Sequence, residues 1–203
     1  MIMTTPMILQ TLKDYSNPAC RLGRMVDNGI YTKVVRGLYE TDPDTPGYRL
    51  AQAIRNPSYL SFEWALSYYG LIPEAVRTYT CATYLTHRSK RYSNHFGNYS
   101  YNDTAPKAFP YCTRMFTDNG YSWWIAEPEK AICDELYSKP PVYSLRDMED
   151  MLFEDLRIDE DELLKMDSGT IAELSGLYGS SNVKLFSKLM GRRTDEQRDQ
   201  EHA

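Results

Sequence analysis

Apolar residues recur at helical spacing in two short segments near the start of the chain. The first follows Thr5-Pro6, a good helix start because proline is tolerated at the first helical position. The second spans about 17–28, where Asn17 can cap the helix and Gly29 can end it in a left-handed conformation. The pattern therefore predicts two helices before residue 30. Their apolar positions are Ile8, Leu9, Leu12 and Tyr15 in the first, and Ala19, Leu22, Met25 and Val26 in the second.

From Ile30 to Thr41 the pattern changes to β-branched and aromatic residues around Arg36-Gly37, which predicts a β-hairpin. Residues 42–47 (DPDTPG) are rich in proline and glycine and therefore predict a linker. We predict a small domain of residues 1–42 on this basis. A helix followed by a hairpin is the layout of a winged helix-turn-helix. A full winged domain has three helices before its hairpin and only two fit here, which leaves a truncated form open.

A larger second domain is predicted over residues 48–191. Ser61 can cap a helix of about 62–69 that Gly70 ends. Residues 76–127 are typical mainly of antiparallel strands. The clearest pair is 111–117 with 121–126, because Asp118-Asn119-Gly120 between them is a strong hairpin signal.

The chain turns helical again at Pro128. Ser144 with Asp147 resembles a capping box, and a further helix is predicted from about 168 to 178. Residues 192–203 are polar and are predicted to be a disordered tail. The predicted fold is therefore α+β: a small winged-helix-like domain, then a larger domain with an antiparallel or mixed sheet and C-terminal helices.

Charge is distributed unevenly although the net charge of the 203 residues is only −5. Residues 1–40 hold five basic and three acidic side chains, and residues 71–114 hold six basic and two acidic ones. Residues 144–166 are acidic, with nine acidic against three basic side chains, and predict solvated helix faces. The net charge argues against a chain that coats nucleic acid indiscriminately, and the charges of the separate segments are more informative than the total.

The helix at 17–28 is the first candidate site. Arg21, Arg24 and Asn28 share the side opposite its apolar face. Arginine binds guanine and asparagine binds adenine in the major groove, while Lys33 and Arg36 on the hairpin are placed for flanking phosphates. The alternative is that these five residues form the ordinary charged side of a surface helix and hairpin.

A second basic segment spans residues 86–92 (THRSKRY), with His95 and Phe96 nearby. Rings that stack on bases beside cations that meet phosphates are typical of RNA or nucleotide binding. A solvated loop between two strands explains the segment better. The unusually numerous tyrosines, 17 in all, favour half-exposed sheets or interfaces.

Signatures of catalysis and of cofactor binding are absent from the sequence, so we predict a protein that is not an enzyme. It has no glycine-rich phosphate loop, dinucleotide fingerprint or nucleophile elbow. Three histidines and four dispersed cysteines predict neither a metal site nor disulfides, but reduced and mostly buried thiols. Residues 127–130 (EPEK) are interpreted as the acidic first turn of a helix. No export signal or membrane span is evident, which predicts a cytoplasmic protein. Because no cofactor-binding motif is present, we also predict that the protein has no cofactor.

Three blocks of the sequence resemble the AbiEi antitoxin family of bacterial toxin–antitoxin operons. They are residues 36–39 (RGLY), 56–72 (NPSYLSFEWALSYYGLI) and 125–134 (IAEPEKAICD), and they occur in that family in this order. The likeness covers roughly residues 5–190, and the middle block is its most specific part. The resemblance implies an N-terminal winged helix-turn-helix that binds inverted repeats in its own promoter. It also implies a larger domain needed to oppose a nucleotidyltransferase-type toxin without necessarily forming a stable complex with it, the type IV arrangement of phage-defence systems.

The leading hypothesis is therefore a DNA-binding antitoxin that represses its own operon, as a homodimer or through cooperative binding to two half-sites. The alternative is an antitoxin that masks its toxin directly and no longer reads DNA. A third hypothesis, an enzyme that modifies the toxin, is disfavoured by the lack of a nucleotide-binding motif. The small domain has little core of its own, so we expect it to pack against the second domain or a twin subunit.

Overall fold

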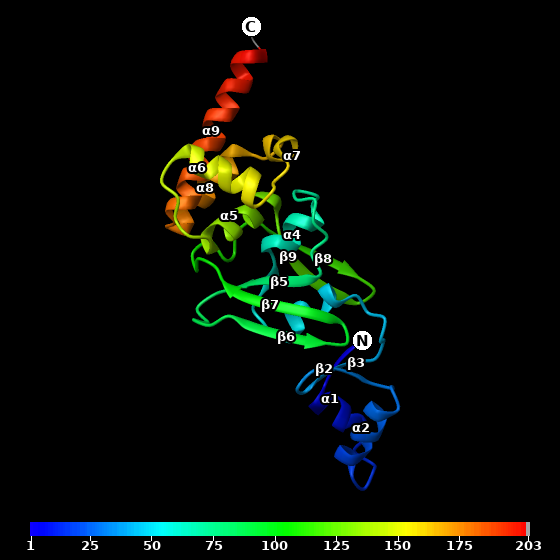
Figure 1. The fold of residues 1–203 in the computed structure, drawn as a ribbon. Helices are drawn as coiled ribbons and strands as arrows, with labels where there is room; N and C mark the ends of the chain where they lie inside the picture. Colours follow the sequence, from blue (N-terminus) through cyan, green and yellow to red (C-terminus); the bar gives the residue numbers. More distant parts are fainter. Residues whose placement is uncertain (202–203) are drawn as a thin grey trace.

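The computed structural model describes residues 1–201, and side chains as far as Asp195. A small N-terminal unit lies at one end of the molecule, a six-stranded sheet in the middle and a helical layer at the other end (Figure 1). The last helix projects from that layer. The fold is thus α+β with a mixed sheet and C-terminal helices, as the sequence predicts.

The small unit, residues 1–41, joins two helices to a three-stranded antiparallel sheet of order β1-β3-β2. The predicted helix and hairpin are confirmed. The Asn17 side chain caps α2 by accepting from the backbone N–H of Cys20 at 3.0 Å, and Gly29 adopts φ 73° after it. Strand β1 was not predicted, because a strand of three residues is too short to show alternating apolar and polar positions. The elements are β1 (Ile2–Thr4), α1 (Thr5–Thr11), α2 (Pro18–Asp27), β2 (Thr32–Val35) and β3 (Leu38–Glu40).

The central sheet has the order β6-β7-β5-β4-β9-β8. Its two outer pairs, β6–β7 and β8–β9, are hairpins, whereas β5–β7 and β4–β9 pair in parallel. The predicted turn at Asn119-Gly120 is confirmed, with positive φ at both residues. The two-residue strand β4 was missed because it is too short to show alternation. The strands are β4 (Tyr59–Leu60), β5 (Thr78–Thr83), β6 (Lys90–Asn94), β7 (Gly97–Asp103), β8 (Thr113–Asp118) and β9 (Tyr121–Ala126).

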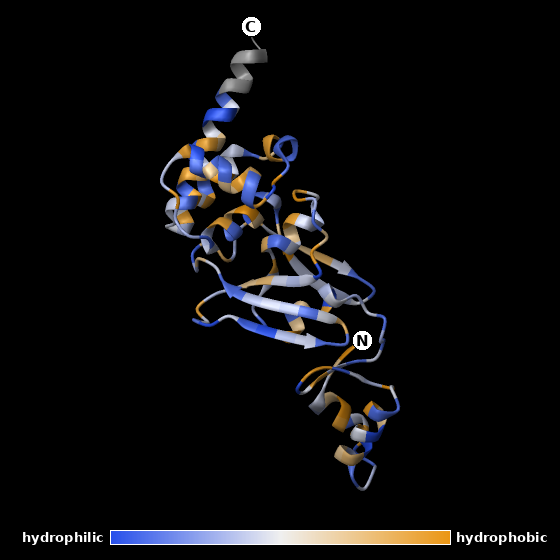
Figure 2. Ribbon diagram, in the orientation of Figure 1, coloured by the Kyte–Doolittle hydropathy of each residue, from blue (hydrophilic) through white to orange (hydrophobic). Residues whose placement is uncertain are grey.

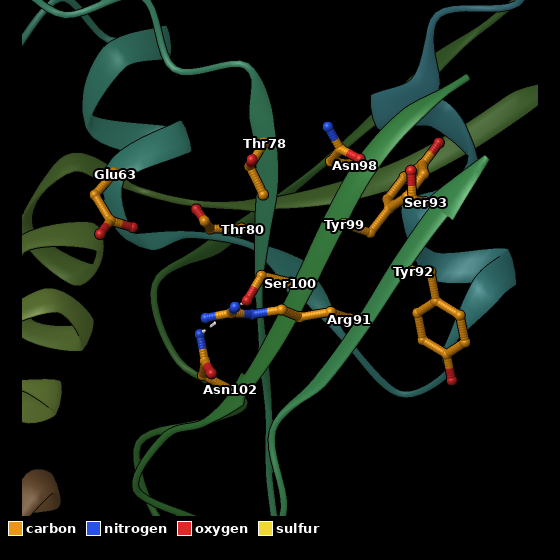
Figure 3. Close-up of a pocket in the computed structure, with 10 residues that line it drawn as sticks. All are labelled: Glu63, Thr78, Thr80, Arg91, Tyr92, Ser93, Asn98, Tyr99, Ser100 and Asn102. Atoms are coloured by element: carbon orange, nitrogen blue, oxygen red, sulfur yellow. Dashed lines mark hydrogen bonds between the residues drawn. The ribbon is translucent and has the colours of Figure 1, made fainter. Parts of the chain in front are cut away.

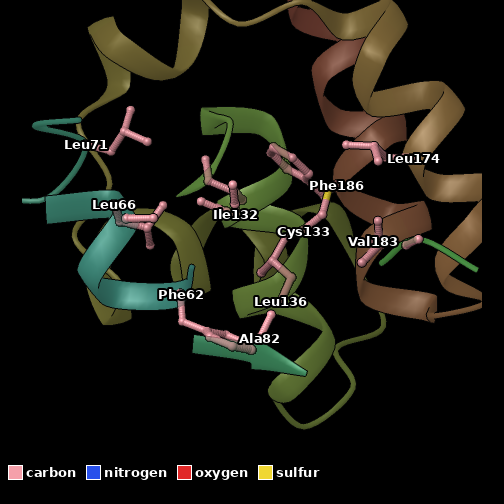
Figure 4. Packing of buried hydrophobic residues seen from close by; sticks show 14 of the residues in the cluster. Phe62, Leu66, Leu71, Ala82, Ile132, Cys133, Leu136, Leu174, Val183 and Phe186 are labelled. Atoms are coloured by element: carbon pink, nitrogen blue, oxygen red, sulfur yellow. The ribbon is translucent and has the colours of Figure 1, made fainter. Parts of the chain in front are cut away.

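Short helices cover both faces of the sheet. On one face, Tyr99 and Tyr101 donate hydrogen bonds to the backbone oxygens of Gly47 and Ala51, at 3.0 and 2.6 Å. On the other face, the apolar side of the helices packs on Ala82 (Figure 4). The main core therefore lies between the sheet and the helical layer. The covering helices are η1 (Gly47–Leu50) and α3 (Ala51–Ile54) on the first face, and α4 (Phe62–Tyr68) and α5 (Pro128–Ser138) on the second.

The chain after α5 forms a helical layer that packs on that helix. The predicted helix 168–178 is confirmed as α8, and the capping box between Ser144 and Asp147 is confirmed in both directions. The layer comprises α6 (Leu145–Asp150), the π-helical turn η2 (Met151–Asp155), α7 (Glu160–Leu164), α8 (Ser168–Tyr178) and α9 (Ser181–Glu201).

The prediction of a disordered tail at 192–203 is wrong for residues 192–201, which continue α9. Arg193 pairs with Glu149 and Glu160 and lies over the ring of Phe153. These contacts anchor α9 past its last buried apolar residues. Arginine, glutamate and glutamine also have high helix propensity, which favours continuation of the helix. Residues 202–203 lie outside the described residues.

Two apolar clusters hold the small unit. Ile8, Leu12 and Leu22 form its own cluster between α1 and α2. Val34 and Leu38 of the hairpin share a second cluster with Leu50 and Phe96 of the larger part, near the waist visible in Figure 2. The expectation that the small domain packs against the second one is confirmed.

The cysteines differ in exposure: Cys81 and Cys133 are buried, Cys112 is half-buried and Cys20 is exposed. Burial raises the pKa of the Cys81 and Cys133 thiols. We expect a disulfide reagent to modify Cys20 rapidly in the native protein, and Cys81 and Cys133 only after denaturation, because the thiolate is the reactive form. Absorbance of the released thiol measures both phases. A rapid phase that survives Cys20→Ser would contradict this assignment.

Candidate nucleic-acid interface

Helix α2 presents its polar side to solvent. Leu22 is buried against the α1 residues Ile8 and Leu12, whereas Arg21, Arg24 and Asn28 are exposed. The helix is strongly amphipathic, so burying its apolar side turns the two arginines outward. The structure thus brings the three sequence-predicted residues of this helix to its solvent side.

The surroundings of these residues leave their polar groups accessible. The Arg21 guanidinium lies over the ring of Tyr15, 5.1 Å from its centroid, a cation–π contact that leaves the edges of the guanidinium group exposed. Arg24 lies in the last turn of α2, where a cation is favoured by the helix dipole. Asn28 caps the helix through its backbone N–H, which donates to the oxygen of Arg24, so its side-chain amide is not used for capping.

The hairpin after α2 carries the other two predicted residues. Lys33 is exposed on β2, just before the pairing of β2 with β3 shifts in register. Arg36 is exposed in the hairpin turn, next to Gly37, whose φ is 83°. Between residues 1 and 41 the exposed basic side chains number five and the exposed acidic side chains two. Glu40, the third acidic residue, is buried and accepts hydrogen bonds from two backbone N–H groups. The exposed surface of the small unit therefore carries a larger excess of basic over acidic side chains than its sequence as a whole.

The second basic segment is divided between a loop and a strand. Residues 84–89 form an exposed loop, as expected, and Asp103 anchors it by accepting from the backbone N–H groups of Thr86 and His87 at 2.9 and 2.7 Å. Burial acts to raise the pKa of Asp103, but hydrogen bonds from the Thr86 and Thr83 hydroxyls together with these two N–H groups outweigh it and lower that pKa. His95 and Phe96 lie instead in the β6–β7 turn, where Phe96 packs against the small unit and the His95 ring contacts the oxygen of Pro43 at 3.0 Å. The structure does not gather this segment into one aromatic and basic surface.

A buried polar cluster around Asp134 was missed from the sequence. Lys130 and Asp134 of α5 are both 0% exposed, with Nζ 3.5 Å from Oδ1. Lys130 donates to the oxygen of Ala108 at 2.8 Å and lies over the ring of Tyr178, 4.6 Å from its centroid. Burial lowers the pKa of Lys130 against the opposing effect of Asp134. The hydroxyls that donate to Asp134 are those of Tyr59 (2.9 Å), Ser61 (2.7 Å), Tyr178 (2.6 Å) and Thr104.

This cluster joins β4, α5 and α8, and its complete burial favours a structural role. The interpretation of residues 127–130 as a helix start is confirmed, since α5 begins at Pro128 and Glu129 lies in its first turn. The missed signal was a Lys–Asp pair at i and i+4 inside an otherwise apolar segment. Ser61 begins α4 as predicted, but its hydroxyl binds Asp134 rather than capping the helix.

Neither a cluster of metal ligands nor a membrane-spanning helix occurs in the part of the chain that the structure describes. Within residues 1–195, whose side chains the structure describes, no three His, Cys, Asp or Glu side chains gather as metal ligands would. None of the helices described combines the length and apolar character that a bilayer crossing requires. No protein-family model and no curated protein matches the chain.

Proposed function

We propose that the chain is a cytoplasmic, non-enzymatic antitoxin that binds its own promoter as an autorepressor and counteracts a nucleotidyltransferase-type toxin. The observation that carries the proposal is the exposed row of Arg21, Arg24 and Asn28 on α2, followed at once by a hairpin with exposed Lys33 and Arg36. The resemblance of three sequence blocks to the AbiEi antitoxins supplies the biological setting.

The chemistry of these side chains suits a duplex. An α-helix fits the major groove, where arginine can donate two hydrogen bonds to guanine and asparagine can pair with adenine. Lysine and arginine on a following hairpin bind phosphates and set the orientation on the DNA. The strand order β1-β3-β2 beside α1 and α2 supports a shortened winged helix-turn-helix, with two helices before the hairpin in place of three and α2 as the recognition helix. Binding to inverted repeats requires two copies, so we include a homodimer in the proposal.

We expect the double variant Arg21→Ala/Arg24→Ala to bind the DNA upstream of its own gene at least about tenfold more weakly, because each base contact contributes about 1–3 kcal/mol. Fluorescence anisotropy over a range of salt concentrations measures this. Lys33→Ala and Arg36→Ala should each lower the slope of log affinity against log salt by about one. Bound DNA should also slow the modification of Cys20, which lies next to Arg21 on α2.

A matched control is Arg146→Ala/Lys184→Ala, which removes two exposed cations from the helical layer at the far end of the molecule. It has the same net charge as the α2 variant and should bind promoter DNA like the wild type. Equal losses in the two double variants would mean that only net charge matters, and no loss in the α2 variant would remove α2 from the recognition role.

The alternative, an antitoxin that masks its toxin directly, is favoured by one observation. The acidic side chains of the helical layer are exposed on α6, η2 and α7, among them Asp147, Asp150, Glu154, Asp159 and Asp161. A basic toxin surface would complement them. Co-purification with the product of the neighbouring gene, lost when these residues are neutralised, would support direct masking over control through DNA.

A further inference from the structure

A hollow of about 590 Å³ lies beside α4 on strands β5–β7, on the part of that sheet face that α4 and α5 leave uncovered. Figure 3 shows Glu63 on α4 at one side of the hollow, apart from the other labelled side chains, while Arg91 extends from β6 across β7 toward Ser100 and Asn102. Its volume lies in the range of small-molecule sites, about 300–1,000 Å³. We call this hollow the sheet groove.

Strand alternation explains why the sheet groove is polar. Tyr99 and Tyr101 point to the opposite face, where their hydroxyls bind the oxygens of Gly47 and Ala51. The residues that alternate with these tyrosines along β7, such as Ser100, face the sheet groove and are small and polar. A helix would gain little by covering these polar residues, so this part of the face stays open to solvent.

Much of the hydrogen-bonding capacity of the sheet groove is unused. Among the ion pairs described for residues 1–195, none includes Arg91 or Glu63, whereas Arg49, Arg157 and Arg193 all pair with carboxylates. Asn102 makes one long contact, from Nδ2 to the Ser100 hydroxyl at 3.4 Å. The groove therefore offers a cation, a carboxylate and neutral donors to a ligand.

The positions of these groups select a class of ligand. A guanidinium group offers paired N–H donors that match a carboxylate or a phosphate. The Asn102 amide and the Ser100 hydroxyl next to Arg91 add neutral donors. Glu63, on the α4 side, accepts hydrogen bonds from hydroxyl or ammonium groups. The rings of Tyr92 and Tyr99 point away from the groove, so it offers no stacking platform for a base or an apolar ring.

We propose that the sheet groove binds a small organic anion, a carboxylate or a phosphate, that also carries hydroxyl or amino groups. Arg91 holds the anionic group with Ser100 and Asn102, and Glu63 holds the hydroxyl or amino groups. The site is separate from α2 and the hairpin, and its occupancy does not depend on DNA binding.

Isothermal titration calorimetry of the full chain, without DNA, tests the proposal with four probes. Ribose 5-phosphate and L-glutamate represent the phosphate and carboxylate sources, inorganic phosphate tests the anion alone, and glucose tests the hydroxyl groups alone. We expect saturable binding of one of the first two, at least about tenfold tighter than of inorganic phosphate or glucose. Failure of both to saturate by about 10 mM would overturn the proposal.

Variants then assign the binding to the sheet groove. Arg91→Gln should weaken the bound probe at least about tenfold, and Glu63→Gln should weaken it less, because it keeps an acceptor oxygen. Arg88→Gln is the matched control, since Arg88 is an exposed arginine on the loop before β6 and does not line the groove. All three should unfold at the wild-type temperature. Unchanged binding in Arg91→Gln, or an equal loss in Arg88→Gln, would overturn the assignment.

Discussion

Replacing Asp134 with alanine is expected to destabilise the fold by about 3–5 kcal/mol, the usual result of breaking a buried ion pair from one side. The carboxylate is 0% exposed and accepts hydrogen bonds from four hydroxyls. Without it those hydroxyls lose their shared acceptor, and the Lys130 ammonium stays buried with one carbonyl and two rings as partners. Urea unfolding followed by tryptophan fluorescence measures the loss.

The matched control is Asp150→Ala, the same substitution at an exposed position of α6. It should change the free energy of unfolding by less than about 0.5 kcal/mol, as surface substitutions usually do. Asp134→Asn keeps the shape and one acceptor oxygen, so it should give an intermediate loss and remain measurable if the alanine variant does not fold. An Asp134→Ala protein as stable as Asp150→Ala would show that the cluster is not needed for stability.

Gly47→Ala is expected to cost about 1–3 kcal/mol, the range for inserting a carbon into a packed site. An added Cβ would overlap the backbone oxygen of Phe96 and the ring of Tyr79, whose Cζ would lie at 2.9 Å. The Phe96 oxygen cannot move unless the β6–β7 turn, to which it belongs, moves with it. That turn also holds the small unit, because Asn94 donates from Nδ2 to the oxygen of Val34 at 2.9 Å.

Two measurements separate this effect from a general loss of stability. Gly176→Ala places the same substitution in α8, where a Cβ would meet nothing within 4 Å, and it should stabilise the protein by up to about 1 kcal/mol through helix propensity. Hydrogen exchange should accelerate at residues 94–97 and in β2 of the Gly47→Ala protein. A variant that unfolds and exchanges like the wild type would mean that the junction has room to adjust.

Locally encoded features were predictable. Asn17 caps the start of α2, and Pro18 has its φ already fixed near a helical value. Gly29 ends the helix in a left-handed conformation. Each of these effects acts within a few residues of the chain. The amphipathic pattern of α2 was enough to predict that Arg21 and Arg24 would be exposed, because one side of a surface helix must be buried. The turn at Asn119-Gly120 likewise needs positive φ at both residues.

The sequence by itself determined the order of helices and hairpins, the polar side of α2 and the basic character of the small unit. Tertiary structure alone decided the parallel pairing of β5 with β7, the burial of Lys130 with Asp134, and the extension of α9 through Arg193. The reason is distance along the chain. Capping and amphipathicity are satisfied by neighbouring residues, whereas these three features need partners that only the folded chain brings together. The sheet groove belongs to the second group, since Arg91 and Glu63 face it from separate elements.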